Sequence, residues 1–357
     1  MNPFRRRGPL GSAASNESIR HLLSRAVQRG RSPGLIAAIV DRRGIRAIAA
    51  AGVRKVGHAQ PLLTTDLVHI GSNTKAMTAT MLAVLVHDGV FDSGWNTSIV
   101  EVFPELRDDI HPDYHAVTLW QLVTMTGGIP CDAADWKAHG DAHLIERRYR
   151  ILRDNLADPP GAAPGKHLYS NLAYLVAGAM AERVTTRTWE SLMWERLFMP
   201  LGVTSAGFGA PGTPEELGAP WGHQRDPDSG NWVPDQDDNA AALGPAGTVH
   251  IGIEDWARFF SLWLTREPPA IGDRETLGRL VTPVAGRYAA GWLVVRRLWA
   301  RGRAITHDGS NGSWYTKLWV APAVGRAYVV AANSVEADVR RTFALLDGIV
   351  LRLMFRA

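Results

Sequence analysis

The sequence predicts an α/β (α+β) fold: one antiparallel sheet formed from both chain ends, helices that flank this sheet, and an inserted, mostly helical subdomain. Apolar runs rich in Ile, Val and Ala occur near both termini, each beside an amphipathic helical stretch. The middle of the chain shows helical pieces and no long alternating stretch. A chain of 357 residues is long enough for one enzyme made of two subdomains.

The N-terminal part predicts a helix, a hairpin and a buried helix, in that order. Apolar residues recur at helical spacing over 18–29, which predicts an amphipathic helix that ends before Pro33. The apolar runs 35–40 and 45–51 predict two strands joined by a hairpin loop. Residues 72–88 are apolar on nearly all sides, which predicts a buried helix.

The rest of the chain predicts helices first and strands afterwards. From about residue 92 to 245, helical pieces alternate with loops rich in Pro, Gly, Asp and Trp. The runs 287–295, 315–320 and 327–332 read as strands, and an apolar stripe over 339–353 predicts a last helix. The end of the chain thus mirrors its beginning.

We therefore expect a flexible N-terminal tail at 1–15 and a single domain over 16–357. Its sheet-bearing subdomain comprises about 16–75 and 245–357, and its helical subdomain comprises about 76–244. The tail is basic and lacks the apolar run of a secretory signal. We expect a cytoplasmic protein, or a periplasmic one if the chain start is misassigned.

Composition and charge exclude several classes of protein. The chain has 39 Lys and Arg against 35 Asp and Glu, a net charge of +4, and these charges are interleaved, so no basic stripe predicts nucleic-acid binding. No apolar stretch approaches the roughly 20 residues of a membrane span. A single cysteine, Cys131, excludes an internal disulfide, and without a zinc-type Cys/His spacing we expect no metal and no cofactor. The histidine pairs His111/His115 and His139/His143 are interrupted by Pro or Gly, so we interpret them as loop histidines.

The segment 69–75 places a hydroxyl and an amine three residues apart at the start of the buried helix. At this spacing Ser72 and Lys75 share one helix face. A serine becomes a nucleophile when a base takes its proton, and a desolvated lysine can be that base. The helix N-terminus adds N–H groups near a developing oxyanion. The alternative is a helix cap with a surface lysine, but the chain has five lysines in all, and the helix is too apolar to be a solvated face.

A second candidate segment follows a Pro-Gly turn. Tyr169 and Asn171 alternate in it, so in an extended conformation they point the same way. A phenol near an ammonium can ionise below its usual pKa and relay protons, and a carboxamide can hold both a lysine and a substrate carbonyl. The alternative is a buried tyrosine with a turn asparagine.

A third segment combines His307, Gly309 and Ser310. Glycine at 309 would let a substrate lie against a strand edge, and the Ser310 N–H could be a second oxyanion donor beside that of Ser72. The alternative is a glycine-rich turn.

These three segments, in this order, resemble the serine β-lactamase-like superfamily, which includes class C β-lactamases, D-alanyl-D-alanine carboxypeptidases and related serine esterases. Ser72 to Lys75 match its S-x-x-K motif, Tyr169 to Asn171 its Y-x-N motif, and His307 to Gly309 its K-T-G or H-x-G element. Flanking stretches at 122–130 (LVTMTGGIP), 200–202 (PLG) and 244–259 (GPAGTVHIGIEDWARF) are similar to family segments, so the resemblance covers roughly residues 16–354.

The resemblance implies a β-lactamase-like fold and a serine hydrolase. By it, Ser72 is acylated, Lys75 and Tyr169 share the proton transfers, and Asn171 orients the lysine and the substrate. The N–H groups of Ser72 and Ser310 form the oxyanion hole.

The departure at His307, where the K-T-G form of the third motif has lysine, replaces a fixed cation by a group only partly charged near neutral pH. This change favours an esterase acting on small esters or amides. The alternatives are a β-lactamase or D,D-peptidase acting on lactams or peptidoglycan peptides, and a catalytically silent ligand-binding relative. No G-x-S-x-G elbow is present, which disfavours an α/β-hydrolase. Trp136 and Trp314, close to these segments, are possible pocket-lining residues. The sequence specifies neither the physiological substrate nor the oligomeric state.

Overall fold

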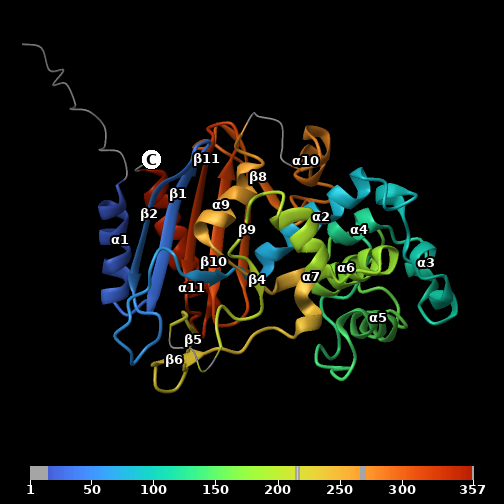
Figure 1. The fold of residues 1–357 in the computed structure, drawn as a ribbon, viewed down its shortest axis with the longest axis horizontal. Coiled ribbons are helices and arrows are strands. Elements are labelled where there is room, and N and C mark those ends of the chain that lie inside the picture. Colours follow the sequence, from blue (N-terminus) through green and yellow to red (C-terminus); the bar gives the residue numbers. More distant parts are fainter. Residues whose placement is uncertain (1–14, 214, 216–217, 266–270, 356–357) are drawn as a thin grey trace, which may run out of the picture.

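The protein is built around a six-stranded antiparallel sheet with the strand order β2-β1-β11-β10-β9-β8 (Figure 1). The computed structural model describes residues 15–213, 215, 218–265 and 271–355. The six strands are β1 Gly34–Asp41, β2 Gly44–Gly52, β8 Leu293–Arg297, β9 Gly302–Ser310, β10 Tyr315–Ala321 and β11 Arg326–Ala332.

Both ends of the chain meet inside this sheet. Strand β1 pairs with β11, with Leu35 opposite Ala332 and Asp41 opposite Arg326. The terminal helices α1 (Asn16–Gln28) and α11 (Val339–Met354) contribute to the apolar core on one face of the sheet. The predicted α+β architecture, with a sheet formed from both chain ends and flanked by helices, is confirmed.

The other face of the sheet packs against the larger core of the molecule, which contains most of the helices (Figure 1). These helices are α2 Thr74–His87, α3 Ile99–Val102, α4 Leu119–Val123, α5 Leu144–Asn155, α6 Asn171–Thr185, α7 Trp189–Met193, α8 Gly244–Gly247, α9 Ile253–Ser261 and α10 Arg274–Leu280. Helix α2 is buried along nearly its whole length, as its all-round apolar sequence predicts.

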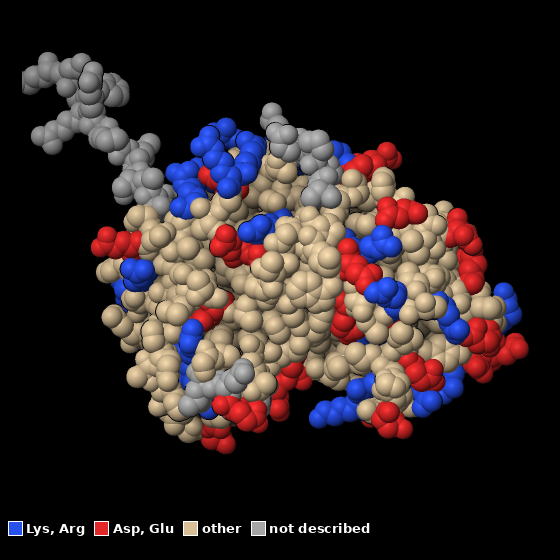
Figure 2. Space-filling model, viewed as in Figure 1, with Lys and Arg blue, Asp and Glu red and all other residues tan. Residues whose placement is uncertain are grey.

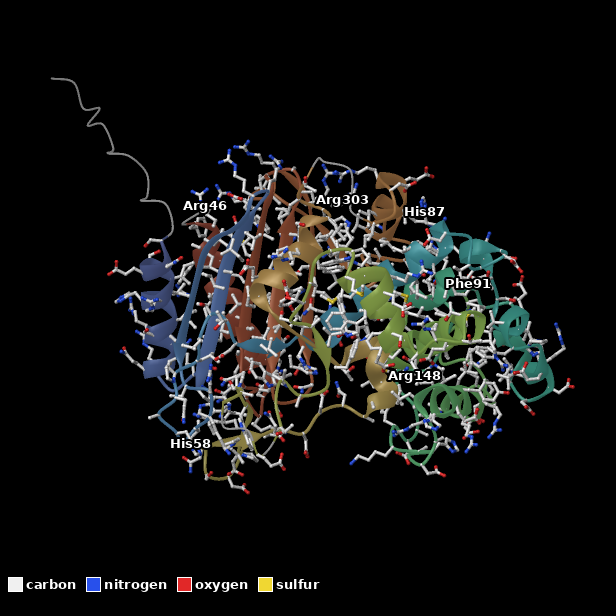
Figure 3. The ribbon with its side chains drawn as sticks, viewed as in Figure 1. Arg46, His58, His87, Phe91, Arg148 and Arg303 are labelled. Atoms are coloured by element: carbon white, nitrogen blue, oxygen red, sulfur yellow. The ribbon has the colours of Figure 1, made fainter. Side chains whose placement is uncertain are left out.

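A buried ion pair fixes the helices to the chain that leads into the site. Arg148 of α5, which Figure 3 labels, is fully buried and lies 2.5 Å from both Glu182 of α6 and Glu190 of α7. Its guanidinium also donates to the carbonyls of Ala241 and Ala242, which lie three and two residues before α8. Arg148 therefore ties three helices to the segment beside the site.

Two small sheets complete the fold. Strands β3 (Leu67–His69), β7 (Val249–Gly252) and β4 (Gly207–Phe208) form one, and β5 (Gly222–Arg225) with β6 (Trp232–Asp235) forms the other.

The β5–β6 hairpin falls inside the range 76–244 that the sequence assigned to the helical subdomain. Its backbone nevertheless bonds to the segments flanking β10 and β11, because His223 N–H donates to the Ser313 carbonyl and its own carbonyl accepts from Val335. This hairpin therefore packs with the large sheet.

Two strand predictions need correction. The range 287–295 was expected to be one strand, but β8 begins only at Leu293, and Gly291 has a φ of +75°, which an extended strand does not adopt. Strand β9 was not predicted as a strand, although it carries the third candidate segment. The predicted tail lies outside the described residues except for Ser15, whose side chain accepts from Ser18 N–H and caps α1.

Basic and acidic side chains are interspersed over most of the face shown in Figure 2. Within the described ranges, no helix is both long and apolar enough to cross a membrane. The same residues contain no cluster of three or more His, Cys, Asp or Glu side chains that could hold a metal ion.

Candidate active site

Ser72 lies where strand β3 passes into helix α2. A short 3₁₀ turn, Gly71–Asn73, joins the two elements and opens the helix. Gly71 has a φ of +49°, and a Cβ on it would lie 2.2 Å from the Ser310 backbone nitrogen. Only glycine allows this turn to approach the end of β9, so the spacing of Ser72 and Ser310 depends on it.

Lys75 and Ser72 form the predicted pair on one helix face. Lys75 Nζ lies 3.0 Å from Ser72 Oγ, 2.7 Å from Asn171 Oδ1 and 2.8 Å from the Ala246 carbonyl oxygen. The lysine is fully buried, and none of these partners is charged. Burial therefore lowers the pKa of Lys75 to about 7, although the carboxylate of Asp132 partly opposes the shift.

This environment suits both protonation states of the lysine. A neutral amine has two N–H groups, which Asn171 and Ala246 accept, and one lone pair, which faces Ser72 Oγ. A protonated amine donates to all three oxygens. Lys75 can therefore take the Ser72 proton without losing a hydrogen-bond partner.

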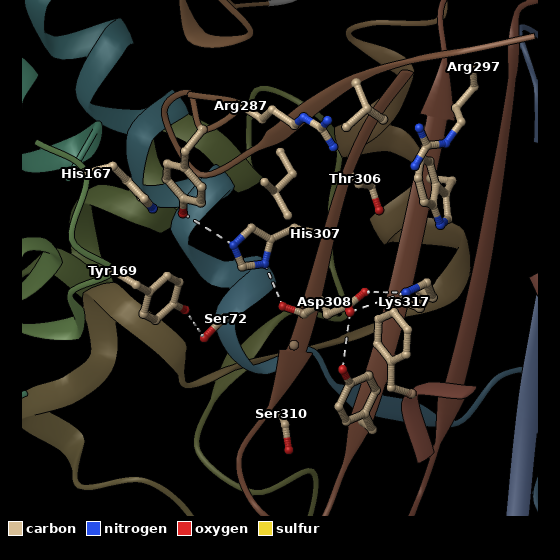
Figure 4. A pocket seen from close by; sticks show the side chains of 17 residues that line it. Ser72, His167, Tyr169, Arg287, Arg297, Thr306, His307, Asp308, Ser310 and Lys317 are labelled. Atoms are coloured by element: carbon tan, nitrogen blue, oxygen red, sulfur yellow. Dashed lines mark hydrogen bonds and ion pairs between the residues drawn. The ribbon is translucent and has the colours of Figure 1, made fainter. Parts of the chain in front are cut away.

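Tyr169 completes the contacts of the serine hydroxyl. Its OH donates to Ser72 Oγ at 2.9 Å, as Figure 4 shows. Burial raises the pKa of Tyr169 to about 12, although the hydrogen bond with Ser72 opposes this shift. The expectation that this phenol ionises below its usual pKa is therefore wrong, because burial disfavours the phenolate. Tyr169 is a proton donor at neutral pH.

Asn171 is held by a residue that the sequence did not single out. Its Nδ2 donates to Asp132 Oδ1 at 2.7 Å, which turns its Oδ1 toward Lys75. The backbone N–H of Asn171 also donates to the Cys131 carbonyl. Residues 131–132 thus set the orientation of the carboxamide.

Strand β9 brings the third segment to the serine. A Cβ on Gly309 would lie 1.9 Å from the Ile70 carbonyl oxygen, so glycine is needed for this close approach. Asn73 Nδ2 donates to Thr316 Oγ1 of β10 at 3.0 Å and joins the turn to the sheet. The backbone nitrogen of Ser310 follows beside Gly71, the residue before Ser72, and its role as an oxyanion donor stays a prediction.

His307 is buried and has both ring nitrogens occupied. Nδ1 lies 2.5 Å from the Asp308 carbonyl oxygen, which can only accept, so Nδ1 carries the proton. Nε2 lies 3.3 Å from the Tyr288 hydroxyl, which donates to it. Burial, and to a smaller extent the charge of Lys75, lowers the pKa of His307 to about 4. His307 is therefore neutral at neutral pH.

These residues open onto a cavity of about 590 Å³ between the serine and the edge of the large sheet (Figure 4). The lining includes Ser72, His167, Tyr169, Arg287, Tyr288, Leu293, Val295, Arg297, Thr306, His307, Asp308, Gly309, Ser310, Tyr315, Lys317, Trp319 and Phe343. The two tryptophans suggested by the sequence are not among them. Trp314 is buried against Gly222, and Trp136 packs against the larger core of the molecule.

The structure thus brings Ser72, Lys75, Tyr169, Asn171, His307, Gly309 and Ser310 to one place. Sequence reasoning missed Asp132 and Tyr288, which touch Asn171 and His307. The sequence signal for Asp132 was its place two residues after Pro130 in a family-like stretch, but its partner is a contact of the folded chain.

Comparisons with solved structures agree with this fold. D-amino acid amidase from Ochrobactrum anthropi has a TM-score of 0.76 at 20% identity, with 95% of this chain and 98% of that chain covered. A class C β-lactamase from Rhodobacter sphaeroides has a TM-score of 0.73 at 19% identity, with coverages of 93% and 99%. These similarities confirm the β-lactamase-like fold.

Relatives in sequence point to the same family. Penicillin-binding protein 4 of Amycolatopsis lactamdurans is 26% identical over 324 residues, covering 82% of this chain and 78% of that protein. Unguisins hydrolase ungD' of Aspergillus campestris is 24% identical over 339 residues, covering 89% of this chain but 62% of that protein. The family model described as Beta-lactamase matches residues 19–348. With this match over nearly its whole length, and a serine hydroxyl in contact with a buried lysine, the chain belongs to the Beta-lactamase family of serine hydrolases.

Proposed function

We propose that this protein is a carboxylesterase-like hydrolase that cleaves small, uncharged esters or amides through an acyl-enzyme on Ser72. Neutral Lys75 accepts the Oγ proton while Oγ attacks the substrate carbonyl carbon. The N–H groups of Ser72 and Ser310 stabilise the resulting oxyanion. Tyr169 donates to the serine oxygen, and Asn171 orients the lysine and the substrate.

The acyl-enzyme then forms and breaks by ordinary acyl transfer. The tetrahedral intermediate collapses, the bond to the alcohol or amine breaks, and the proton held by Lys75 passes to that leaving group. Water attacks the acyl carbon next, with Lys75 again taking the proton. The acid leaves, and Ser72 recovers its hydrogen.

The observation that carries the preference for uncharged substrates is the state of His307. A cation at this place would attract a substrate carboxylate, but His307 is neutral and its two nitrogens already have partners. Lys317, the nearest lysine of the cavity wall, is held by Asp308 at 3.1 Å. Of the described residues that line the cavity near the serine, neither His307 nor Lys317 therefore offers a free cation to a lactam or peptide carboxylate.

The other cations that line the cavity, Arg287 and Arg297, are exposed to solvent. Arg287 precedes β8, Arg297 ends it, and Figure 4 places both guanidinium groups far from Ser72.

A serine-directed phosphonate tests whether the site is catalytic. We expect one covalent adduct on Ser72 by mass spectrometry and none in Ser72→Ala. An unlabelled native protein, in a preparation whose circular dichroism shows it to be folded, would instead support the silent ligand-binding alternative.

Parallel rates test the substrate class. We expect p-nitrophenyl butyrate to be hydrolysed with a higher kcat/KM than a chromogenic cephalosporin. The methyl ester of the same cephalosporin is the matched control, since it lacks the carboxylate, and we expect it to react faster than the free acid. A preference for the free acid would overturn the esterase proposal in favour of a β-lactamase or D,D-peptidase.

A further inference from the structure

We propose that Asp238 is a positioning residue that holds together the two backbone segments bearing the oxyanion donors. Asp238 lies in the loop after β6, and its side chain is 9% exposed. Its carboxylate contacts His69, which precedes the turn that carries Ser72, and Asn311, which follows Ser310. This role rests on the proposed function, since it concerns the N–H groups that would stabilise the reaction's oxyanion.

The first contact reaches the turn that carries Ser72. The Nε2 atom of His69 lies 3.0 Å from Asp238 Oδ1, and the His69 side chain is fully buried. His69 Nδ1 accepts from the Gly71 backbone N–H at 3.1 Å, so the proton of a neutral ring is on Nε2, the nitrogen beside the carboxylate. The contact between Nε2 and Asp238 is an ion-pair contact without hydrogen-bond geometry. The carboxylate thus packs against a histidine whose other nitrogen accepts from Gly71, the residue before Ser72.

This arrangement is not a second proton relay. His69 directs its free nitrogen to the Gly71 N–H, so it has no lone pair left for the Ser72 hydroxyl. Lys75 and Tyr169 already occupy that hydroxyl. Asp238 and His69 therefore act on backbone position.

The second contact reaches the end of β9. Asn311 Nδ2 donates to the same Asp238 Oδ1 at 2.9 Å, and Asn311 directly follows Ser310. Asn311 Oδ1 accepts from the backbone N–H groups of Ser313 and Trp314, which fixes the turn after β9. One carboxylate oxygen thus joins two segments that are more than 200 residues apart in the sequence.

These contacts matter because the position of an oxyanion donor controls how much it stabilises the transition state. Gly71 and Ser310 already touch, and a shift of either segment would move an N–H away from the developing charge. Removing one donor completely costs about 10²–10³ in rate, and misplacing it costs less. Loss of Asp238 should therefore slow acylation without weakening substrate binding.

Three substitutions separate the contacts of Asp238 with His69 and Asn311 from the negative charge of its carboxylate. Asp238→Ala removes both contacts, whereas Asp238→Asn keeps an oxygen where His69 and Asn311 converge. Asn311→Asp removes the Nδ2 donor but keeps oxygens for Ser313 and Trp314. Asp255→Ala is the matched control, because Asp255 is also 9% exposed and accepts from the N–H groups of Thr204 and Ser205.

With p-nitrophenyl butyrate we expect kcat to fall about tenfold in Asp238→Ala and Asn311→Asp, while KM changes less than about twofold. The inhibition constant of phenylboronic acid, whose tetrahedral anion needs the same donors, should rise by a similar factor. Asp238→Asn should stay within about threefold of the native kcat. Asp255→Ala should lower Tm and leave the kcat of the folded enzyme unchanged.

Hydrogen–deuterium exchange provides a readout that needs no catalysis. Peptides covering 69–73 and 308–313 should exchange faster in Asp238→Ala, whereas peptides of α5 should not change. Unchanged exchange in both segments would overturn the positioning role, whether or not the native protein hydrolyses esters. An inert native protein with faster exchange in Asp238→Ala would instead contradict the proposed function and leave the tie established.

Discussion

Two of the five lysines are buried, and their surroundings differ in charge. Lys75 is 0% exposed and contacts three uncharged oxygens. Lys317 is 2% exposed, and its ammonium lies 3.1 Å from Asp308 and 3.6 Å from Asp347. The two lysines are almost equally buried, so what distinguishes their environments is the presence of carboxylates beside Lys317.

The difference shows what makes a lysine a base in this fold. Water stabilises an ammonium, and burial removes that stabilisation. At Lys75 no carboxylate touches the amine, and its pKa falls to about 7 through burial. At Lys317 two carboxylates offset the cost of burying the charge. Lys75 is suited to proton transfer, and Lys317 is suited to holding β10 to its neighbours.

The largest expected effect is on the rate of acylation. Lys75→Met removes the base, and because a general base contributes about 10²–10⁴-fold, we expect the phosphonate labelling rate to fall by that factor. Lys317→Met should label Ser72 at close to the native rate at a temperature where it is folded. Equal losses in the two variants would contradict the distinction between base and structural cation.

The second expected effect is on stability and concerns Lys317. Breaking a fully buried ion pair costs about 3–5 kcal/mol, but Asp308 and Asp347 keep some contact with water, so we expect Lys317→Met to lose about 2 kcal/mol. Urea unfolding followed by fluorescence measures this free energy. Adding Asp308→Asn, which removes one stranded carboxylate, should recover part of it. A variant as stable as the native protein would show that the pair contributes little.

The sequence was sufficient for four of the six strands of the large sheet and for the contact between Ser72 and Lys75. Apolar runs at both ends predicted β1, β2, β10 and β11; β1, β10 and β11 are buried almost throughout, and β2 is half-buried at the edge of the sheet. The helical spacing of Ser72 and Lys75 predicted their contact, since three residues make nearly one turn. These features depend on local pattern, which one sequence displays.

Features that depend on contacts between distant segments were not predictable. Strand β9 contains the polar residues Thr306, His307 and Asp308, so its sequence lacks the apolar run that predicts a buried strand, although most of it is buried. The scarcity of lysine made each of the five a candidate for a special role. The sequence around Lys317 does not reveal the two carboxylates that contact it, so Lys317 could not be told apart from Lys75 in this way. The raised pKa of Tyr169 follows from burial by chain segments far from it.

The smallest expected effect is on the pH dependence of the acylation rate. It tests the influence of the Asp132 carboxylate on Lys75. Acylation needs the neutral amine, so its rate should rise with pH through a midpoint near 7, where Lys75 loses its proton. Burial sets this value, and the Asp132 carboxylate opposes burial by favouring the ammonium. Asp132→Asn removes the charge but keeps an oxygen for Asn171 Nδ2, so the midpoint should move to lower pH.

Asp135→Asn is the control for that change, because Asp135 lies in the same exposed loop and accepts from Lys137 N–H rather than from Asn171. Its rate profile should match the native one, and so should that of Lys317→Met. Salt should shrink the shift in Asp132→Asn, since the carboxylate is exposed to solvent. A midpoint that stays in place, or moves to higher pH, would mean that Asp132 acts on Lys75 only through the orientation of Asn171.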